Sequence, residues 1–215
     1  MIEAVIFDMD GVLIDSEGAY LQFDLAFARS KNPEVTLEQL YGMVGSSRED
    51  AWGCMARAIG NGQTWEELRD EFRGSVDVFS QMDYPSIFRQ EARTVLEWLK
   101  QQGYRLALAS STQMDIIQRV LRENQIGGYF SQVVSGGQFR RSKPDPEIYH
   151  YTAARLGVKE SRCFVVEDST FGITAAKRAG MTVAALEDDR FGFDQSGADF
   201  RIRDLREIPD CLKQL

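Results

Sequence analysis

The sequence predicts an α/β protein with a parallel β-sheet that opens at the N-terminus, is interrupted by a helical insertion, and resumes at about residue 86. Two observations support this prediction. The chain opens with a short apolar run that ends on two aspartates, Asp8 and Asp10, as a buried strand of a parallel sheet often does. After Pro85, helical patterns alternate with apolar runs, which is the rhythm of βα units.

The first strand begins at Ile2 and leads into Asp8 and Asp10, with Gly11 directly behind them. Its β-branched and aromatic residues suit a strand that is buried on both faces, and the carboxyl ends of such strands are where open α/β sheets bind ligands. Because strand side chains alternate between faces, we expect Asp8 and Asp10 to share one side. Two carboxylates on one side repel each other, so a cation or a shared proton has to compensate.

The insertion, residues 16–85, carries apolar residues at helical spacing and no sign of a strand. Its helical segments are residues 19–28, 49–60 and 64–79. Large aromatic residues recur in it at helical intervals, which favours a packed core of this unit over a ligand-stacking surface. These residues are Trp52, Trp65, Phe72 and Phe79.

The rest of the chain, residues 86–215, predicts alternating helices and strands. The helical segments are residues 89–103, 114–125, 147–157 and 171–180, and the strands that follow them are within residues 104–111, 132–137, 162–168 and 181–188. Gly103, Gly157 and Gly180 follow three of these helices, where a left-handed residue often ends a helix. Residues 198–202 are expected to add a short last strand, and residues 205–212 a closing helix.

Composition narrows the class of protein. The chain has 215 residues, of which 43% are hydrophobic, and a formal net charge of −8, which argues against nucleic acid or an anionic membrane as the main partner. We therefore expect a small-molecule substrate and a monomer. With a first strand that begins at Ile2 and no apolar run near the length of a membrane span, we expect a cytoplasmic protein. The cysteines are Cys54, Cys163 and Cys211, whose spacing indicates reduced packing residues rather than a disulfide framework or a zinc site.

Polar side chains follow the strands of the resumed sheet. They are Ser110, Ser111 and Thr112 after the first strand, Lys143 after the second, and Glu167 and Asp168 after the third. Each of these residues alone can be explained as a turn, cap or surface residue. Asp145, which precedes Pro146, is expected to be a helix N-cap. Because the ends of parallel strands meet at one edge, we expect a shared site there. Its members are Asp8, Asp10, Ser110, Lys143, Glu167 and Asp168.

Two other groups of ionisable residues are read as non-catalytic. His150, the only histidine, falls inside a predicted helix and is taken as structural or surface. The acidic run at residues 187–189 follows a strand end and is best explained as a solvated loop.

Four segments in this order, DMDGVLIDSE, LALASS, SKPDPEIY and VVEDS, resemble the four motifs of the haloacid dehalogenase-like (HAD) superfamily. The resemblance is to the branch that contains β-phosphoglucomutase and small phosphosugar phosphatases, and it extends over nearly the whole chain. It implies a Rossmann-like three-layer core, residues 1–15 and 86–215, with an all-helical cap domain, residues 16–85.

The chemistry of these residues fits phosphoryl transfer. Asp8 is the candidate nucleophile, which forms an aspartyl phosphate. Asp10 lies among acidic neighbours that favour its protonated form, so it can protonate the leaving oxygen and afterwards deprotonate water. Lys143 offsets the charge of nucleophile and phosphate, and the resemblance implies the same catalytic assignments.

The remaining site residues hold the metal and the phosphate. Asp8, Glu167 and Asp168 offer oxygen ligands to a divalent cation, most simply Mg²⁺, and the resemblance adds the backbone carbonyl of Asp10. Hydroxyl and N–H groups at the end of the LALASS strand are expected to hold phosphoryl oxygens, and a glycine before the cap lets the chain turn closely past the ligand. These residues are Ser110, Ser111 and Gly11.

Two cap residues bear on specificity. Arg48 resembles the cap arginine with which the mutase grips the second phosphate of a sugar bisphosphate, although a surface residue paired with Glu49 or Asp50 is an equal interpretation. Tyr20 stands where the mutase branch has a histidine that tunes the chemistry of Asp10.

The sequence therefore favours a Mg²⁺-dependent phosphatase that hydrolyses a small phosphorylated metabolite, a sugar phosphate, through an aspartyl-phosphate intermediate. β-Phosphoglucomutase, which interconverts β-glucose 1-phosphate and glucose 6-phosphate, is the alternative. A non-catalytic module that binds metal or senses sugar phosphates is a third interpretation. A dehalogenase proper is disfavoured because it needs neither metal nor Asp10.

Overall fold

The computed structural model describes residues 1–44, 46 and 48–215, and the side chain of Arg48 lies outside the described part. The chain divides into two compact units. The first comprises Met1–Asp15, Tyr84–Asp188 and Phe193–Leu215, and the second comprises Ser16–Asp83 and Asp189–Gly192. The second unit thus contains most of the predicted insertion together with a short segment that begins at the last residue of the acidic run.

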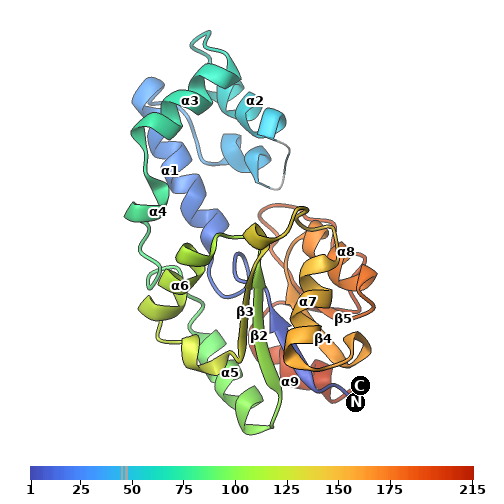
Figure 1. Ribbon diagram of the computed structural model, residues 1–215. Coiled ribbons are helices and arrows are strands. Elements are labelled where there is room, and N and C mark those ends of the chain that lie inside the picture. The colour runs from blue at the N-terminus through green and yellow to red at the C-terminus, as the bar shows by residue number, and fades with distance from the viewer. Residues whose placement is uncertain (45, 47) are drawn as a thin grey trace. The chain divides into compact units, whose positions relative to one another are not determined.

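A parallel sheet forms the centre of the first unit (Figure 1). Its strands are β1 (Ala4–Phe7), β2 (Arg105–Ser110), β3 (Gln132–Ser135), β4 (Cys163–Glu167), β5 (Thr182–Leu186) and β6 (Phe200–Ile202). They lie in the order β3-β2-β1-β4-β5-β6, and every neighbouring pair is parallel. The predicted α/β fold is confirmed. Because β1 lies between β2 and β4, its carboxyl end is at the point where the strand order reverses, which is where such sheets bind ligands.

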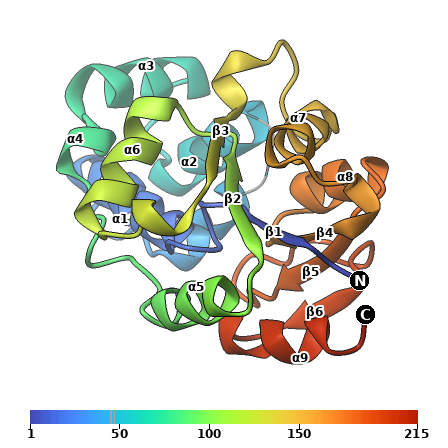
Figure 2. The same cartoon turned by 60° about the horizontal axis from the view of Figure 1, so that its bottom comes forward.

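Helices cover both faces of this sheet (Figure 2). One face carries α5 (Glu91–Gln101), α6 (Met114–Glu123) and α9 (Ile208–Leu212), and the other carries α7 (Glu147–Leu156) and α8 (Thr170–Arg178). Short 3₁₀ helices complete the connections: η2 (Gly127–Tyr129), η3 (Gly136–Gln138), η4 (Glu160–Arg162) and η5 (Leu205–Glu207). On the second face, Ile6 and Val165 of the sheet share a buried core with Tyr149 and Ala176 of the helices. This packing fixes both helices close to the strand ends that matter for the site.

The helix ends follow the sequence pattern with one difference. Gly103, Gly157 and Gly180 have φ values of 86°, 67° and 77°, so the predicted left-handed residues are confirmed. The predicted N-cap of α7 is wrong by one position, because Pro146 occupies it. Asp145 still satisfies a first-turn donor, since its Oδ1 accepts from the backbone N–H of Glu147 at 3.1 Å.

The second unit is helical in its described residues. It contains α1 (Ser16–Lys31), η1 (Glu38–Met43), α2 (Arg48–Ile59), α3 (Trp65–Ser75) and α4 (Val78–Gln81). Its buried core comprises apolar residues of α1, η1, α2 and α3 and Val35 from the segment between α1 and η1. Two of the four aromatics predicted for it, Trp52 and Phe72, pack against that core. Their ring centroids are 5.5 Å apart. Trp65 instead lies beside the guanidinium of Arg69, 5.2 Å from the ring centroid.

The predicted helix over residues 64–79 is two helices, and this break changes the environment of Phe79. Asp77 caps α4, its carboxylate accepting from the N–H of Ser80 at 3.2 Å, while Val76 is extended after the end of α3. Phe79 therefore leaves the helical register of α3 and is 47% exposed, so its predicted place in the core is wrong. Among the described residues, no helix combines the length and apolarity that crossing a membrane requires.

Candidate active site

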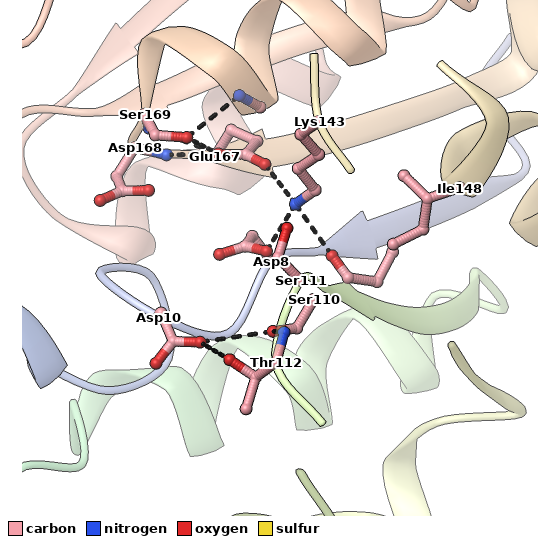
Figure 3. A network of polar contacts seen from close by, with 12 residues as sticks. Asp8, Asp10, Ser110, Ser111, Thr112, Lys143, Ile148, Glu167, Asp168 and Ser169 are labelled. Atoms are coloured by element: carbon pink, nitrogen blue, oxygen red, sulfur yellow. Dashed lines mark hydrogen bonds and ion pairs between the residues drawn. The ribbon is translucent and has the colours of Figure 1, made fainter. Parts of the chain in front are cut away.

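Asp8 directly follows β1, and a lysine from the loop after β3 reaches it. The Lys143 ammonium donates to Asp8 Oδ1 and to Glu167 Oε1, each at 2.6 Å, and to the Ala109 carbonyl at 3.1 Å (Figure 3). Both ion pairs are buried, since the side chains of Lys143, Asp8 and Glu167 are 6%, 9% and 1% exposed. Lys143 thus ties together the carboxyl ends of β1, β2 and β4.

The charges of this cluster are not balanced by the lysine alone. Burial raises the pKa of Asp8 to about 8; the ammonium of Lys143 opposes this effect and the charge of Glu167 adds to it. Although burial would lower the pKa of Lys143, the carboxylates of Asp8 and Glu167 raise it well above its ordinary value. Lys143 therefore stays charged, and a second cation or a proton is needed to compensate the remaining carboxylate.

Glu167 is the most restrained of these carboxylates. Its Oε1 accepts from Lys143 and from the hydroxyl of Tyr149 at 2.7 Å. Its Oε2 accepts from the backbone N–H groups of Asp168 and Ser169 at 3.1 and 3.3 Å, and from the Ser169 hydroxyl at 3.2 Å. Ser169, rather than Asp168, is the N-cap of α8, so the same residue starts the helix and orients the carboxylate.

Asp8, Glu167 and Asp168 can hold a metal ion. One carboxylate oxygen from each lies within 4.8 Å of the others, and all three residues are buried. Oxygen donors of this kind are what Mg²⁺ prefers. Both oxygens of Glu167 already accept hydrogen bonds, so the prediction that it binds metal directly or through water stays open between the two. Gly11 makes room for this group: its φ is 74°, and a Cβ there would lie 2.0 Å from Asp168 Oδ2.

Asp10 is oriented toward the end of β2. Its Oδ2 accepts from the hydroxyl of Thr112 at 2.7 Å and from that of Ser110 at 3.3 Å (Figure 3). Ser110 also accepts from the backbone N–H of Thr112 at 3.0 Å, as a turn residue would. The other oxygen, Oδ1, is buried and has no hydrogen-bond partner within the described residues. The carboxylate is therefore outside the three-carboxylate group, and metal binding through the Asp10 carbonyl stays a prediction.

The structure thus brings together the six predicted residues at the strand ends, but not all the predicted substrate-binding residues. The hydroxyl of Ser111 is exposed and lies 3.2 Å from that of Ser142. Tyr20 belongs to the second unit, and the side chain of Arg48 lies outside the described part of the chain. The substrate contacts of these three residues stay predictions.

The ionisable groups read as non-catalytic have other partners. His150 is 48% exposed in its side chain and lies 3.0 Å from Glu160, in agreement with a surface role. Glu187 pairs with Arg203 at 3.2 Å at the end of β5.

Sequence reasoning gave no role to three residues of the site. Thr112 follows the same strand as Ser110 and was open to the same argument. Tyr149 falls on the buried face of α7, a position that predicts packing but not a hydroxyl directed at Glu167. Gly172 lies in the first turn of α8, and a Cβ there would be 1.8 Å from Glu167 Oε1. A glycine inside a helix, where it costs stability, was the available signal.

Comparisons with known proteins agree with this geometry. The family model for haloacid dehalogenase-like hydrolase matches residues 5–186. A phosphorylated carbohydrates phosphatase from Thermotoga maritima is 34% identical over 186 residues, which cover 84% of this chain and 82% of the relative. Hexitol phosphatase B from Escherichia coli is 30% identical over 217 residues, covering 96% of this chain and 94% of the relative.

Solved structures show the same relationship. A Thermotoga maritima protein provisionally named β-phosphoglucomutase superposes with a TM-score of 0.77 and 30% identity, with each chain covered completely. The chain belongs to the haloacid dehalogenase-like hydrolase family.

Proposed function

We propose that this protein is a Mg²⁺-dependent phosphatase that hydrolyses a small phosphorylated sugar or polyol through an aspartyl phosphate on Asp8. The observation that carries the proposal is the arrangement of Asp8. One of its oxygens is held by Lys143 at 2.6 Å in a buried site, and its neighbour Asp10 is held by two hydroxyl groups. A positioned nucleophile and a separate positioned acid are the two groups that ester hydrolysis requires.

In the first step, Asp8 Oδ2 attacks phosphorus and the bond between phosphorus and the ester oxygen breaks. Lys143 holds Oδ1, which fixes the carboxylate and offsets negative charge as the phosphoryl group approaches. Asp10 donates its proton to the departing oxygen. Its Oδ1 serves this purpose because Oδ2 is occupied by Thr112 and Ser110, while Oδ1 has no partner in the described residues.

In the second step, the ionised Asp10 accepts a proton from water, whose oxygen attacks phosphorus. The bond between phosphorus and Asp8 breaks, phosphate leaves, and Asp8 is regenerated. The hydroxyls of Thr112 and Ser110 hold the Asp10 carboxylate in place through this change of charge, since they can donate to it in either protonation state.

The metal site fits the same proposal. Asp8 and Asp168 would hold Mg²⁺ directly, with Glu167 close enough to take part. When bound, the ion supplies the positive charge that lets buried carboxylates and an anionic phosphoryl group share the site. Without such a cation, burial raises the pKa of Asp8 to about 8, so the charged form of Asp8 is disfavoured. A bound cation would relieve this effect.

The substrate class is supported by the relatives. Two of them, at 34% and 30% identity over most of both chains, are named as phosphatases of phosphorylated carbohydrates and of hexitols. A sugar or polyol phosphate is therefore the substrate that we propose for this chain.

Phosphate release from p-nitrophenyl phosphate, with Mg²⁺ and with a chelator, tests the reaction, and a panel of sugar and polyol phosphates tests the substrate class. We expect turnover that depends on Mg²⁺, a sugar or polyol phosphate among the preferred substrates, and loss of activity in Asp8→Asn. Turnover that persists in Asp8→Asn, or none by the wild type, would contradict the proposal.

The mutase alternative has one specific observation in its favour, the complete overlap with a structure provisionally named β-phosphoglucomutase. Tyr20 speaks against it, because the mutase branch has a histidine at that position. β-Glucose 1-phosphate with a trace of the bisphosphate distinguishes the two: free phosphate should form faster than glucose 6-phosphate. The reverse order would favour the mutase.

A further inference from the structure

The N–H donors of Lys143 are all used in the structure. An ammonium group carries three N–H donors. Their acceptors are Asp8 Oδ1 and Glu167 Oε1, each at 2.6 Å, and the carbonyl of Ala109 at 3.1 Å (Figure 3). To donate directly to a phosphoryl oxygen, Lys143 therefore has to give up one of these partners.

Glu167 is the partner that can be released at the least cost. The bond to Asp8 Oδ1 has to stay, because it orients the oxygen that attacks phosphorus. Glu167, by contrast, accepts from more donors than the roughly four lone-pair sites of a carboxylate can hold well. These donors are the side chains of Lys143, Tyr149 and Ser169 and the backbone N–H groups of Asp168 and Ser169.

Tyr149 is the donor that shares Oε1 of Glu167 with the lysine. Its hydroxyl donates to this oxygen at 2.7 Å, and both residues are fully buried. Because a phenol ionises only at about pH 10, the hydroxyl is a donor at neutral pH. Without it, Oε1 would keep no donor from the described residues once Lys143 moved, and an unsatisfied buried carboxylate oxygen is costly.

The ring of Tyr149 contacts the lysine as well. Lys143 Nζ lies 5.1 Å from the ring centroid, a distance at which the face of an aromatic ring attracts a cation. This attraction uses none of the N–H donors, so it persists while the ammonium changes its hydrogen-bond partner. One buried side chain thus contacts both members of the ion pair between Lys143 and Glu167.

We propose that Tyr149 is a positioning residue whose hydroxyl holds Glu167 while the Lys143 ammonium exchanges its bond to Glu167 for one to an oxygen of the phosphoryl group. Lys143 keeps its bonds to Asp8 and to the Ala109 carbonyl in this exchange. The proposal rests on the proposed function and deepens it, because it identifies the partner that Lys143 releases when the phosphoryl group arrives. Without the hydroxyl, Glu167 would retain the lysine and the phosphoryl group would bind less well.

Tyr149→Phe tests the proposal because it removes the hydroxyl and keeps the ring. We expect the Kd of inorganic phosphate, measured by calorimetry with Mg²⁺, to rise by about ten-fold or more, and kcat/KM for p-nitrophenyl phosphate to fall by a similar factor. Tyr151→Phe is the matched control, because Tyr151 lies on the same helix and is 41% exposed. It should leave both quantities within about two-fold of wild type.

A double-mutant cycle with Glu167→Gln tests the route of the effect. In Glu167→Gln the charge that retains Lys143 is gone, so the hydroxyl of Tyr149 is no longer needed for the exchange. Adding Tyr149→Phe to Glu167→Gln should then change the phosphate Kd by less than about two-fold. A further ten-fold loss in this background would show that Tyr149 acts on phosphate by another route, and it would overturn the proposal.

A purely structural role of Tyr149 predicts a different result. In that case Tyr149→Phe would lower the melting temperature and leave the phosphate Kd unchanged at a temperature where the variant is folded. Values of the phosphate Kd and of kcat/KM that match those of Tyr151→Phe would therefore overturn the proposal. If the wild type nevertheless hydrolyses p-nitrophenyl phosphate, the phosphatase stands without it.

Failure of the proposed function gives a separate result. If the wild type binds inorganic phosphate but hydrolyses no phosphate ester, the phosphatase is refuted, and the phosphate Kd of Tyr149→Phe still decides the role of Tyr149. A wild type that neither binds phosphate nor hydrolyses an ester would overturn this proposal too, because Lys143 would then meet no phosphoryl group.

Discussion

At the scale of single residues, the site is a balance of buried charges in which each group depends on its neighbours. Lys143 is shared between Asp8 and Glu167, and Glu167 is held in turn by Tyr149 and Ser169. Removing one partner leaves the others buried without compensation, so effects on stability and on catalysis arise from the same contacts.

Lys143→Met is expected to lower the rate by about a thousand-fold, because the group that positions Asp8 and offsets phosphoryl charge is lost. It should also lower the free energy of unfolding by roughly 3–5 kcal/mol, since two buried carboxylates lose their cation. Urea unfolding and phosphate release measure the two effects. Adding Asp8→Asn should restore much of the stability and none of the activity; normal activity in Lys143→Met would refute the assigned role.

Thr112→Val tests the orientation of Asp10. The substitution removes the hydroxyl that donates to Asp10 Oδ2 at 2.7 Å while it preserves shape, so we expect kcat to fall by about ten-fold with little change in melting temperature. Thr152→Val is the matched control, because that hydroxyl is buried but bonds only within α7, to the carbonyl of Ile148. Equal kcat values for the two variants would show that Thr112 does not position the acid.

At the scale of elements, strand ends carry the reacting groups, and the helix that follows β4 holds one of these side chains in place. α8 begins directly behind β4, so its first turn packs on the last side chain of that strand. Ser169 caps the helix and binds Glu167, and Gly172 leaves the space that the Glu167 carboxylate fills. The first turn of α8 and the position of the Glu167 carboxylate therefore depend on each other.

Gly172→Ala is expected to disrupt this contact between the first turn of α8 and Glu167. The new Cβ would lie 1.8 Å from Glu167 Oε1, and the carboxylate cannot move without breaking its bonds to Lys143 and Tyr149. We expect a loss of about 1–3 kcal/mol in stability and a marked loss of activity. Gly74→Ala in α3 has open space around it and should be neutral or stabilising by up to about 1 kcal/mol. Similar melting temperatures for both variants would contradict this account.

At the scale of the whole molecule, one unit carries the acidic cluster and the other carries a cavity with a carboxylate that is costly to ionise. The two units need not respond alike to pH, because burial raises the pKa of Asp24 in the second unit to about 7. The other charged groups that line its cavity are Arg73 and Asp77.

Stability should fall with rising pH because of Asp24. The unfolded carboxyl loses its proton near its ordinary value of 3.8, whereas the folded one keeps it up to about pH 7. The stabilising contribution is thus complete below about pH 4, is lost as pH rises toward 7, and stays lost above. Asp8, also raised, changes stability in the same direction, so the difference between wild type and Asp24→Asn isolates the effect of Asp24.

Urea unfolding at pH 5 and pH 8 measures this difference. Asp24→Asn should reduce the decrease in stability between the two pH values by about 1–3 kcal/mol, allowing for the partial exposure of the group. Glu66→Gln, at an exposed position of the same unit, should not change it. An unchanged decrease in Asp24→Asn would show that Asp24 ionises normally in the folded protein.

Much of the fold was predictable because the hydrophobic periodicity and the helix-ending residues agreed. The alternation of helices and strands after residue 86 and the three helix-ending glycines each have a local cause. The meeting of Asp8, Lys143 and Glu167 was predictable because parallel strands end at one edge. The break between α3 and α4 at Val76 and Asp77 was not predictable, because the helical sequence pattern continues across these residues. Only the cap of α4 interrupts the helix there. The contact of Tyr149 with Glu167 was not predictable either, because burial on a helix face does not fix the direction of a hydroxyl group.

The most direct test of the central claim is to look for a phosphoryl group on Asp8. Asp10→Asn mixed with p-nitrophenyl phosphate and Mg²⁺ should accumulate the intermediate, because the good leaving group needs no acid while the second step lacks its base. After acid quench, mass spectrometry should find one phosphoryl group on the N-terminal peptide at Asp8, and none in Asp8→Asn. Phosphate release by the wild type with no label on Asp8 under these conditions, or with Asp8→Asn still active, would contradict the account.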